Sequence, residues 1–232
     1  MLIKAIWNDF LELIFPTCCV VCSQVLVSNE TWICTPCRFE LPTFTDFQNK
    51  DTDLRKVFGT RVPNMEYALA YLKFSKRGKV QAILHHLKYN HSPELGEVLG
   101  RWFGQLLFEA NFNTVFDLII PVPLHPSKLK KRGYNQSEVF AKGLSQTLQL
   151  PYQNDVLIRT KATETQTKKN RLERLQNVAN VFEVVQPQIV QNKHVLVVDD
   201  VVTTGATLEA CLLALIEAGC AKVSIATIAK AG

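Results

Sequence analysis

Two adjacent acids and a group of hydroxylated residues follow one apolar stretch of the sequence. Residues 195–198 read Val-Leu-Val-Val, Asp199 and Asp200 come next, and threonines surround Gly205. An unbroken apolar run predicts a strand that is buried on both faces of a parallel sheet. Open α/β sheets bind ligands at the carboxyl ends of their strands. The sequence therefore predicts a ligand site at these residues.

A helix is expected directly after the threonines, because apolar residues recur at helical spacing from Leu208 to Ile216 and Gly219 follows. The free N–H groups of a helix start, together with threonine hydroxyls, form a cradle for a phosphate. No lysine follows Gly205, which excludes a nucleotide-triphosphate P-loop. The alternative is an ordinary strand-to-helix turn with a Thr N-cap, but a cap requires one hydroxyl and no paired acids.

The acid pair indicates a sugar phosphate, because ionised carboxylates accept hydrogen bonds from ribose hydroxyls while the cradle holds the 5-phosphate. The stretch resembles the phosphoribosyl-pyrophosphate (PRPP) loop of type I phosphoribosyltransferases, whose pattern is an apolar strand, two acids and Thr-Thr-Gly-x-Thr. This resemblance implies that PRPP or ribose 5-phosphate binds here with Mg²⁺. The residues it assigns are Asp199, Asp200, Val201, Val202, Thr203, Thr204, Gly205, Ala206 and Thr207.

Five of the seven cysteines lie between residues 18 and 37. Two Cys-x2-Cys pairs among them, Cys19 with Cys22 and Cys34 with Cys37, predict one tetrahedral structural Zn²⁺ site. Disulfides are the competing explanation, which a reducing compartment disfavours. Cys18 is either a spare thiol or a rival ligand.

A second apolar stretch, residues 115–122, runs into a loop with cations behind it. The loop consists of Pro121, Val122, Pro123, Leu124 and His125, and the cluster 128–132 and Gly-Tyr-Asn-Gln at 133–136 follow. This order resembles the ComF family, which carries Pro-Val-Pro-Leu-His and then Arg-Gly-(Phe/Tyr)-Asn-Gln. Further matches are the box His86-Leu-Lys88-Tyr89 and the spaced residues Arg159, Gln166, Arg171, Arg174 and Asn177. The resemblance extends over residues 19–229.

The family implies an α/β fold: a type I phosphoribosyltransferase (Rossmann-like) parallel sheet flanked by helices, with a small N-terminal zinc-knuckle or hood region over the mouth of the site. It implies displacement of pyrophosphate from C1 of PRPP by a nitrogen nucleophile, with Asp199, Asp200 and Arg132 as catalytic residues and the 121–125 loop on pyrophosphate. A flexible loop with Arg159, Gln166, Lys168, Arg171 and Arg174 is expected to close over the ligand. The acceptor is not identified by the sequence.

Charge is concentrated in one segment. The 232-residue chain has a net charge of +5, whereas residues 125–175 contain eleven Lys and Arg against four acids, a net charge of +7. Such a segment fits a polyanion, either pyrophosphate or nucleic acid. ComF-family members are associated with DNA uptake in natural transformation, so a single-stranded DNA-binding competence factor that uses PRPP non-catalytically is the alternative function.

Three regions are expected: an amphipathic helix and zinc knuckle at 1–45, a linker or cover at 46–65, and a phosphoribosyltransferase-type domain at 66–232. The first fifteen residues mix charges with apolar residues and lack the apolar core of a signal peptide. No apolar run reaches the roughly 18 residues of a membrane span. We therefore expect a cytoplasmic protein, and leave open peripheral membrane contact and the oligomeric state.

Overall fold

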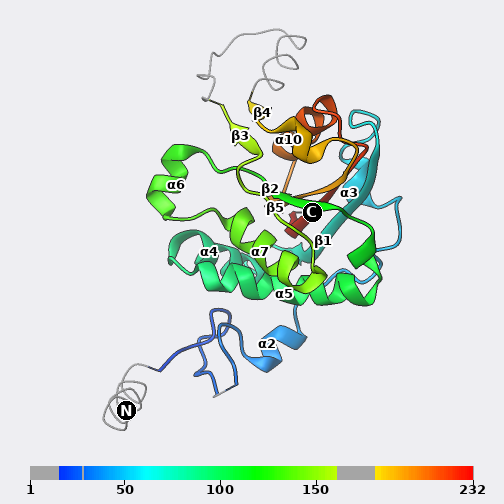
Figure 1. Cartoon of the computed structure of the whole chain (residues 1–232). Helices are drawn as coiled ribbons and strands as arrows, with labels where there is room; N and C mark the ends of the chain where they lie inside the picture. Colours follow the sequence, from blue (N-terminus) through cyan, green and yellow to red (C-terminus); the bar gives the residue numbers. More distant parts are fainter. Residues whose placement is uncertain (1–15, 28, 161–180, 232) are drawn as a thin grey trace.

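A four-stranded parallel sheet forms the centre of the computed structural model, which describes residues 16–27, 29–160 and 181–231 (Figure 1). The strand order is β1-β6-β5-β2, and every neighbouring pair is parallel. The strands are β1 (Met65–Phe74), β6 (Lys222–Ala231), β5 (His194–Val202) and β2 (Leu118–Pro121). Residues 195–198 are fully buried, which confirms the strand that the apolar run predicts.

Helices cover both faces of this sheet (Figure 1). Leu196 and Val198 of β5 pack into a core shared with α4, α5 and α7, whereas Val195 and Val197 pack into a second core with α3 and α10. The alternation follows from the two-residue period of a strand. The bounds are α4 (Lys79–Tyr89), α5 (Pro93–Glu109), α7 (Gln136–Leu148), α3 (Asp53–Lys56) and α10 (Ala206–Glu217). The expected parallel α/β sheet flanked by helices is confirmed.

Shorter elements connect these layers. A two-stranded antiparallel sheet pairs β3 with β4 above α10 (Figure 1). The bounds are α2 (Thr35–Phe39), the 3-10 helix η1 (Phe112–Thr114), α6 (Pro126–Arg132), β3 (Leu157–Arg159), β4 (Phe182–Val184) and α9 (Pro187–Val190). Within the described ranges, no helix combines the length and apolar character that crossing a membrane requires.

The cysteine-bearing segment packs on the helical layer formed by α4 and α5. The Trp32 ring meets His86 of α4 edge-on at 5.8 Å, and the Arg38 guanidinium lies 4.2 Å from the Trp102 ring of α5. Farther along, Thr43 forms an antiparallel bridge with Leu72 of β1. These contacts place the segment beside α4 and α5, and its expected position over the mouth of the site stays a prediction.

Two local expectations differ from the structure. Within the apolar stretch 115–122 the strand is limited to β2, and residues 115–117 connect η1 to it in irregular structure. The basic cluster 128–132, which follows the 121–125 loop in the sequence, lies in the helix α6, which has Pro126 in its first turn and is capped by Gly133 with φ +81°. The segment 46–65 contains α3 and buries Leu54 and Phe58, so it contributes to the second core.

Candidate PRPP site and cysteine cluster

The acid pair lies within the last four residues of β5, where the backbone still follows the strand. Asp199 Oδ1 accepts hydrogen bonds from the Ser137 hydroxyl and from the N–H of Asp200, both at 2.8 Å. Asp200 Oδ1 accepts from the N–H of Val201 at 2.6 Å, and its Oδ2 lies 2.8 Å from Lys88 Nζ. Elements far apart in the sequence, α4, α7 and β5, therefore meet at the two carboxylates.

Burial controls the ionisation of Asp199. Removal from water and, next, the neighbouring Asp200 charge raise its pKa, whereas the Ser137 hydroxyl, the Asp200 N–H and Lys88 lower it, and the net result is a pKa of about 7. Cys211 of α10 is fully buried nearby, and the same loss of solvent raises the pKa of its thiol. Cys211 therefore stays neutral, as expected for a core cysteine.

The loop after the acid pair presents free hydroxyl groups to solvent. Thr203, Thr204 and Thr207 are exposed, and within the described part of the chain none of their hydroxyls has a hydrogen-bond partner. Residues 201–208 and Asp199 line a small polar hollow of about 50 Å³. The loop can therefore offer threonine hydroxyls and the first N–H groups of α10 to one anion.

Gly205 gives this loop its shape. Its φ of +76° lies in the left-handed region, and a Cβ there would approach Val57 Cγ1 to 3.0 Å and Phe58 Cε1 to 3.1 Å. Val57 and Phe58 follow α3, so the segment expected as a linker forms the wall behind the loop. Arg61 strengthens this junction through a 2.9 Å ion pair with Glu209 in the first turn of α10.

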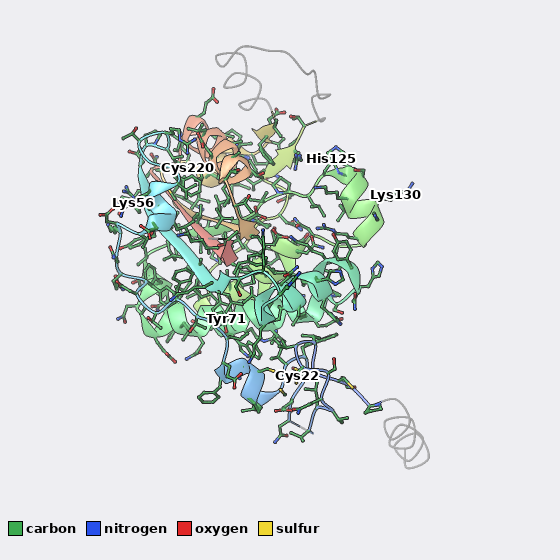
Figure 2. All side chains as sticks on the ribbon, turned by 180° about the vertical axis from the view of Figure 1, so that it is seen from behind. Cys22, Lys56, Tyr71, His125, Lys130 and Cys220 are labelled. Atoms are coloured by element: carbon green, nitrogen blue, oxygen red, sulfur yellow. The ribbon has the colours of Figure 1, made fainter. Side chains whose placement is uncertain are left out.

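The predicted pyrophosphate loop lies at the carboxyl end of β2, next to β5 in the sheet. Pro121 and Val122 are buried, and residues 123–125 are half-buried. The His125 imidazole accepts from the Ser127 N–H at 3.2 Å and so caps α6. Figure 2 shows His125 and Lys130 on an outer side of the molecule.

Arg132 and Gln136 connect α6 with the start of α7. Arg132 donates to Gln136 Oε1 at 2.6 Å, and its guanidinium lies 6.0 Å from the Tyr89 ring. Gln136 is 1% exposed, yet its Nε2 has no partner among the described residues. Within the same part of the chain, no ion pair joins Arg132 to either acid.

Asn135 fixes the start of α7. Its amide donates to the carbonyl of Val122 at 2.9 Å and accepts from the Ser137 N–H at 3.1 Å. One side chain thus links the 121–125 loop to the residue that contacts Asp199.

Three residues that the structure places at the site are not among the predicted site residues. Lys88 and Gln136 stand within the quoted family motifs, but no role follows from the motif alone, and Ser137 carries only a helix-start signal. Of the predicted flexible-loop residues, Arg159 is half-buried in β3, while Gln166, Lys168, Arg171 and Arg174 lie outside the described residues.

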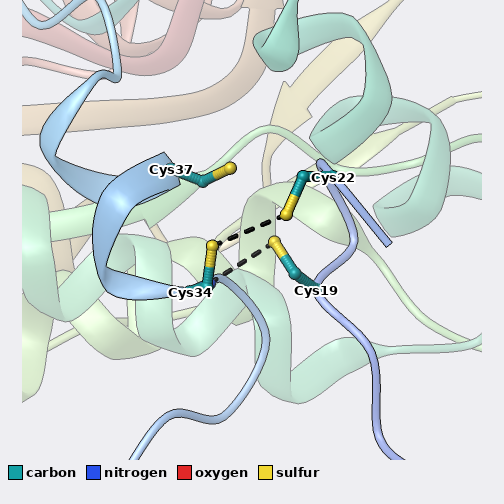
Figure 3. Close-up of side chains that lie close together, drawn as sticks. All are labelled: Cys19, Cys22, Cys34 and Cys37. Atoms are coloured by element: carbon teal, nitrogen blue, oxygen red, sulfur yellow. Dashed lines mark hydrogen bonds between the residues drawn. The ribbon is translucent and has the colours of Figure 1, made fainter. Parts of the chain in front are cut away.

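The four predicted metal ligands come together at one point. Cys19, Cys22, Cys34 and Cys37 direct their sulfur atoms toward a common centre, with Cys37 supplied by α2 (Figure 3). All four sulfurs lie within 4.8 Å of one another, and Cys22 Sγ is 3.6 Å from Cys34 Sγ. Cys18 is exposed and does not belong to the group. The arrangement can hold one metal ion.

The thiols in this group differ in acidity. Burial opposes ionisation of Cys19, but backbone N–H groups, including those of Cys34 and Val21 at 3.4 Å, lower its pKa to about 6. Burial raises the pKa of Cys37. A Cys19 thiolate stabilised by backbone donors is suited to metal ligation, because the thiolate is the form that binds metal.

Comparison with known proteins relates this chain to two groups. Residues 134–232 match the model of the phosphoribosyl transferase domain. Over 146 residues, 62% of this chain and 63% of the relative, it is 34% identical to the DNA utilization protein YhgH of Escherichia coli. It is 35% identical to Competence protein F of Haemophilus influenzae over 116 residues, 50% of this chain and 51% of the relative. The chain thus spans less than two thirds of the length of these relatives.

One similar solved structure is the glutamine PRPP amidotransferase of Bacillus subtilis in complex with ADP and GMP. The match covers 59% of this chain and 26% of the amidotransferase chain. The identity is 25% and the TM-score is 0.42. The overlap is partial, and the fold assignment comes from the sheet topology itself.

Proposed function

We propose that this chain is a ComF-family protein with a phosphoribosyltransferase domain, that it binds PRPP with Mg²⁺, and that it transfers the ribosyl phosphate to an acceptor. The observation that carries this proposal is the sequence of features at the end of β5: two adjacent carboxylates, followed at once by exposed threonines and a helix start. Carboxylates accept from ribose hydroxyls, and the cradle receives the 5-phosphate.

Pyrophosphate is assigned to the loop 121–125 and to Arg132. The adjacency of β2 and β5 supports this assignment, because it brings the two loops to one edge of the sheet. Gln136 adds a buried amide donor that needs an acceptor. A phosphate oxygen would satisfy it.

The side chains of this site match the ligand preference of Mg²⁺ only in part. Carboxylate oxygens are the hard ligands that Mg²⁺ prefers, but within the described residues only the four cysteines form a group of three or more metal-ligating side chains. The ion would therefore be held mainly by oxygens of PRPP and by water. When bound there, the ion would supply positive charge that neutralises the pyrophosphate.

In the transfer reaction, Asp199 and Asp200 hold the ribose hydroxyls and favour positive charge on the sugar ring as pyrophosphate departs from C1. A nitrogen nucleophile of the acceptor then forms the new bond to C1. The names of the relatives connect this group with DNA utilization and competence. We propose that the transfer serves DNA uptake or nucleotide-linked metabolism.

Calorimetric titration of the protein with PRPP and Mg²⁺ tests the proposal. The change Asp199→Asn with Asp200→Asn should weaken binding by about tenfold or more, because a charge-assisted hydrogen bond is worth about 1.5–3 kcal/mol. Equal affinity in the wild type and the double variant, or no binding by the wild type, would refute the site.

The cysteine group is proposed to hold one structural Zn²⁺. Four sulfurs at about 2.3 Å from a tetrahedral ion lie roughly 3.8 Å apart, which agrees with sulfurs that are all within 4.8 Å. The metal would stabilise a segment too short for its own core. It would also fix the surface that contacts α4 and α5.

A second candidate function, single-stranded nucleic-acid binding, is favoured by one surface. His85 and Tyr89 lie one turn apart on the exposed face of α4, with ring centroids at 4.8 Å, and Tyr89 is 58% exposed. On α6, Lys128, Lys130 and Lys131 are exposed and form no ion pair within the described ranges. Aromatic faces stack bases and lysines contact phosphates, so this surface suits a single strand.

Anisotropy with a labelled single-stranded oligonucleotide at low and physiological salt tests this candidate. Charge reversal at Lys128, Lys130 and Lys131, or Tyr89→Ala, should weaken binding, and the charge reversal should also reduce the salt slope. Lys56→Glu, on the opposite side of the molecule (Figure 2), is the control. Charge reversal at Lys168, Lys169 and Arg171 tests the basic segment separately; unchanged affinity there would assign binding elsewhere.

A further inference from the structure

Lys88 reaches the acid pair from a different layer of the fold. It lies in the last turn of α4, and its Nζ is 2.8 Å from Asp200 Oδ2 at the end of β5. The Lys88 and Asp200 side chains are 25% and 17% exposed. In the part of the chain that the structure describes, no other Lys or Arg forms an ion pair with Asp199 or Asp200. Among the described residues, Lys88 is therefore the one cation paired with the acids of the proposed ribose site.

The four carboxylate oxygens of Asp199 and Asp200 differ in whether Ser137 or a backbone N–H donates a hydrogen bond to them. Asp199 Oδ1 and Asp200 Oδ1 are occupied by protein donors, namely Ser137 and backbone N–H groups. Asp199 Oδ2 has no hydrogen bond to any described residue, and Asp200 Oδ2 contacts only Lys88 within the same ranges. These two oxygens are the acceptors left for ribose hydroxyls, and one of them is already shared with an ammonium group.

Sharing is chemically permitted at this position. A carboxylate oxygen has two lone pairs, and an ammonium group has three N–H donors, of which the contact with Asp200 uses one. The ligand, in contrast, brings several negative charges beside two acids, which repel it. A cation that stays on Asp200 reduces this repulsion and retains donors for the oxygens of the ligand.

We propose that Lys88 is a positioning residue of the PRPP site: it orients Asp200 for the ribose hydroxyls, keeps this contact in the complex, and directs its remaining donors to ligand oxygens. This inference rests on the proposed PRPP binding. This proposal differs from two alternatives. In the first, the Lys88–Asp200 ion pair is purely structural and does not affect ligand affinity. In the second, Lys88 blocks Asp200 until the ligand displaces it.

The groups around Asp199 make the role measurable without ligand. They are Asp200 beside it, Lys88 from α4, the Ser137 hydroxyl from α7 and the neutral Cys211 thiol from α10, while Arg159 of β3 acts on Cys211. The Lys88 charge favours ionised Asp199, so its removal should raise the pKa of Asp199. A higher pKa of Asp199 in a variant without the Lys88 charge would show that Lys88 acts electrostatically on the acid pair.

The test compares Lys88→Met with Lys79→Met. Both lysines belong to α4 and both are paired, but Lys79 pairs with Glu40 of the cysteine-bearing segment. For each variant, PRPP affinity with Mg²⁺ is measured by calorimetry between pH 6 and 9, and the Asp199 carboxyl titration is followed by carbon NMR in the ligand-free protein. Lys88→Arg restores the charge and controls for packing.

Lys88→Met should weaken PRPP binding by about tenfold or more, the equivalent of one charge-assisted hydrogen bond. It should also move the Asp199 midpoint to higher pH, whereas Lys79→Met should leave both quantities as in the wild type. Lys88→Arg should keep the wild-type midpoint. This combination supports a positioning role.

Three possible results distinguish a failure of the proposed PRPP binding from a failure of the role proposed for Lys88. If the wild type does not bind PRPP, the proposed function fails and the positioning role fails with it. If the wild type binds and Lys88→Met binds equally well with an unchanged Asp199 midpoint, only the role of Lys88 is overturned. Tighter binding by Lys88→Met also overturns it, because Lys88 then competes with the ligand.

Discussion

The Ser137 hydroxyl on α7 donates a 2.8 Å hydrogen bond to Asp199 Oδ1 on β5. The contact is long-range, and Asn135 supports it by tying the start of α7 to the carbonyl of Val122. A hydroxyl that donates to a carboxylate favours its ionised form, and this bond lowers the pKa of Asp199. The α7 start thus links the loop after β2 with the acid pair.

Ser137→Ala should raise the pKa of Asp199 and weaken PRPP binding at pH 7, with a smaller loss at pH 9 where the carboxyl is ionised in both proteins. Ser145→Ala is the matched control, because Ser145 also lies on α7 and donates to a backbone carbonyl, that of Leu150. Calorimetry at the two pH values measures the difference. An equal loss at pH 7 and pH 9 would contradict the electrostatic explanation.

The stability of the ligand-free protein should depend on the ionisation of Asp199. Its pKa is near 3.8 in the unfolded chain and about 7 in the fold, so the folded state binds more protons between these values. Stability from this group is therefore present at low pH and is lost as pH rises from about 4 to 7. Asp199→Asn removes the charge that is costly to bury.

Thermal unfolding at pH 5 and pH 8 checks this linkage. Asp199→Asn should raise the melting temperature relative to the wild type more at pH 8 than at pH 5. Asp155→Asn is a control at an exposed acid. If Asp199→Asn lowered the melting temperature at both pH values alike, the hydrogen bonds of the carboxylate would outweigh its burial, and the linkage would be wrong.

The metal prediction is one Zn²⁺ per chain, because four sulfurs already converge on one centre. Cys37→Ser should lose the metal and destabilise the contacts with α4 and α5, whereas Cys18→Ser should retain both, since Cys18 lies outside the group. Elemental analysis and unfolding with a chelator measure the two effects. A reduced, folded wild type without zinc would overturn the assignment.

The parts of the fold that could be predicted depend on local patterns. The run 195–198 is apolar at every position and is buried at every position, and the two Cys-x2-Cys pairs meet as their spacing indicates. Periodicity from Leu208 to Ile216 also located α10, which spans Ala206–Glu217. Each of these signals lies within a single short stretch.

The remaining features depend on tertiary contacts. The Lys88–Asp200 pair joins residues from two layers, so no spacing along the chain indicates it. Leu54 and Phe58 carry no sustained period, yet burial against α10 and β1 gives the segment 46–65 a structural role. The short helix α6 buries none of its residues, so hydrophobic periodicity does not indicate a helix over the basic cluster 128–132.

The junction between residues 57–58 and the phosphate loop leads to the last prediction. Gly205 has a φ of +76°, which side chains disfavour, and a Cβ would meet Val57 and Phe58 at 3.0 to 3.1 Å. Gly205→Ala must therefore shift the loop or its wall, which displaces the Thr204 and Ala206 N–H groups from a common anion. We expect PRPP affinity to fall by about tenfold or more.

Gly219→Ala separates loop geometry from general backbone strain. Gly219 also has a positive φ, +96°, but its nearest neighbour to an added Cβ is a flexible Gln191 atom at 3.6 Å, at the far end of α10. Both variants should lose stability, because Ala is strained at either position. Only Gly205→Ala should lose affinity for PRPP and for inorganic phosphate at equal folded fraction. Parallel losses in both variants would mean that the loop is not the phosphate cradle.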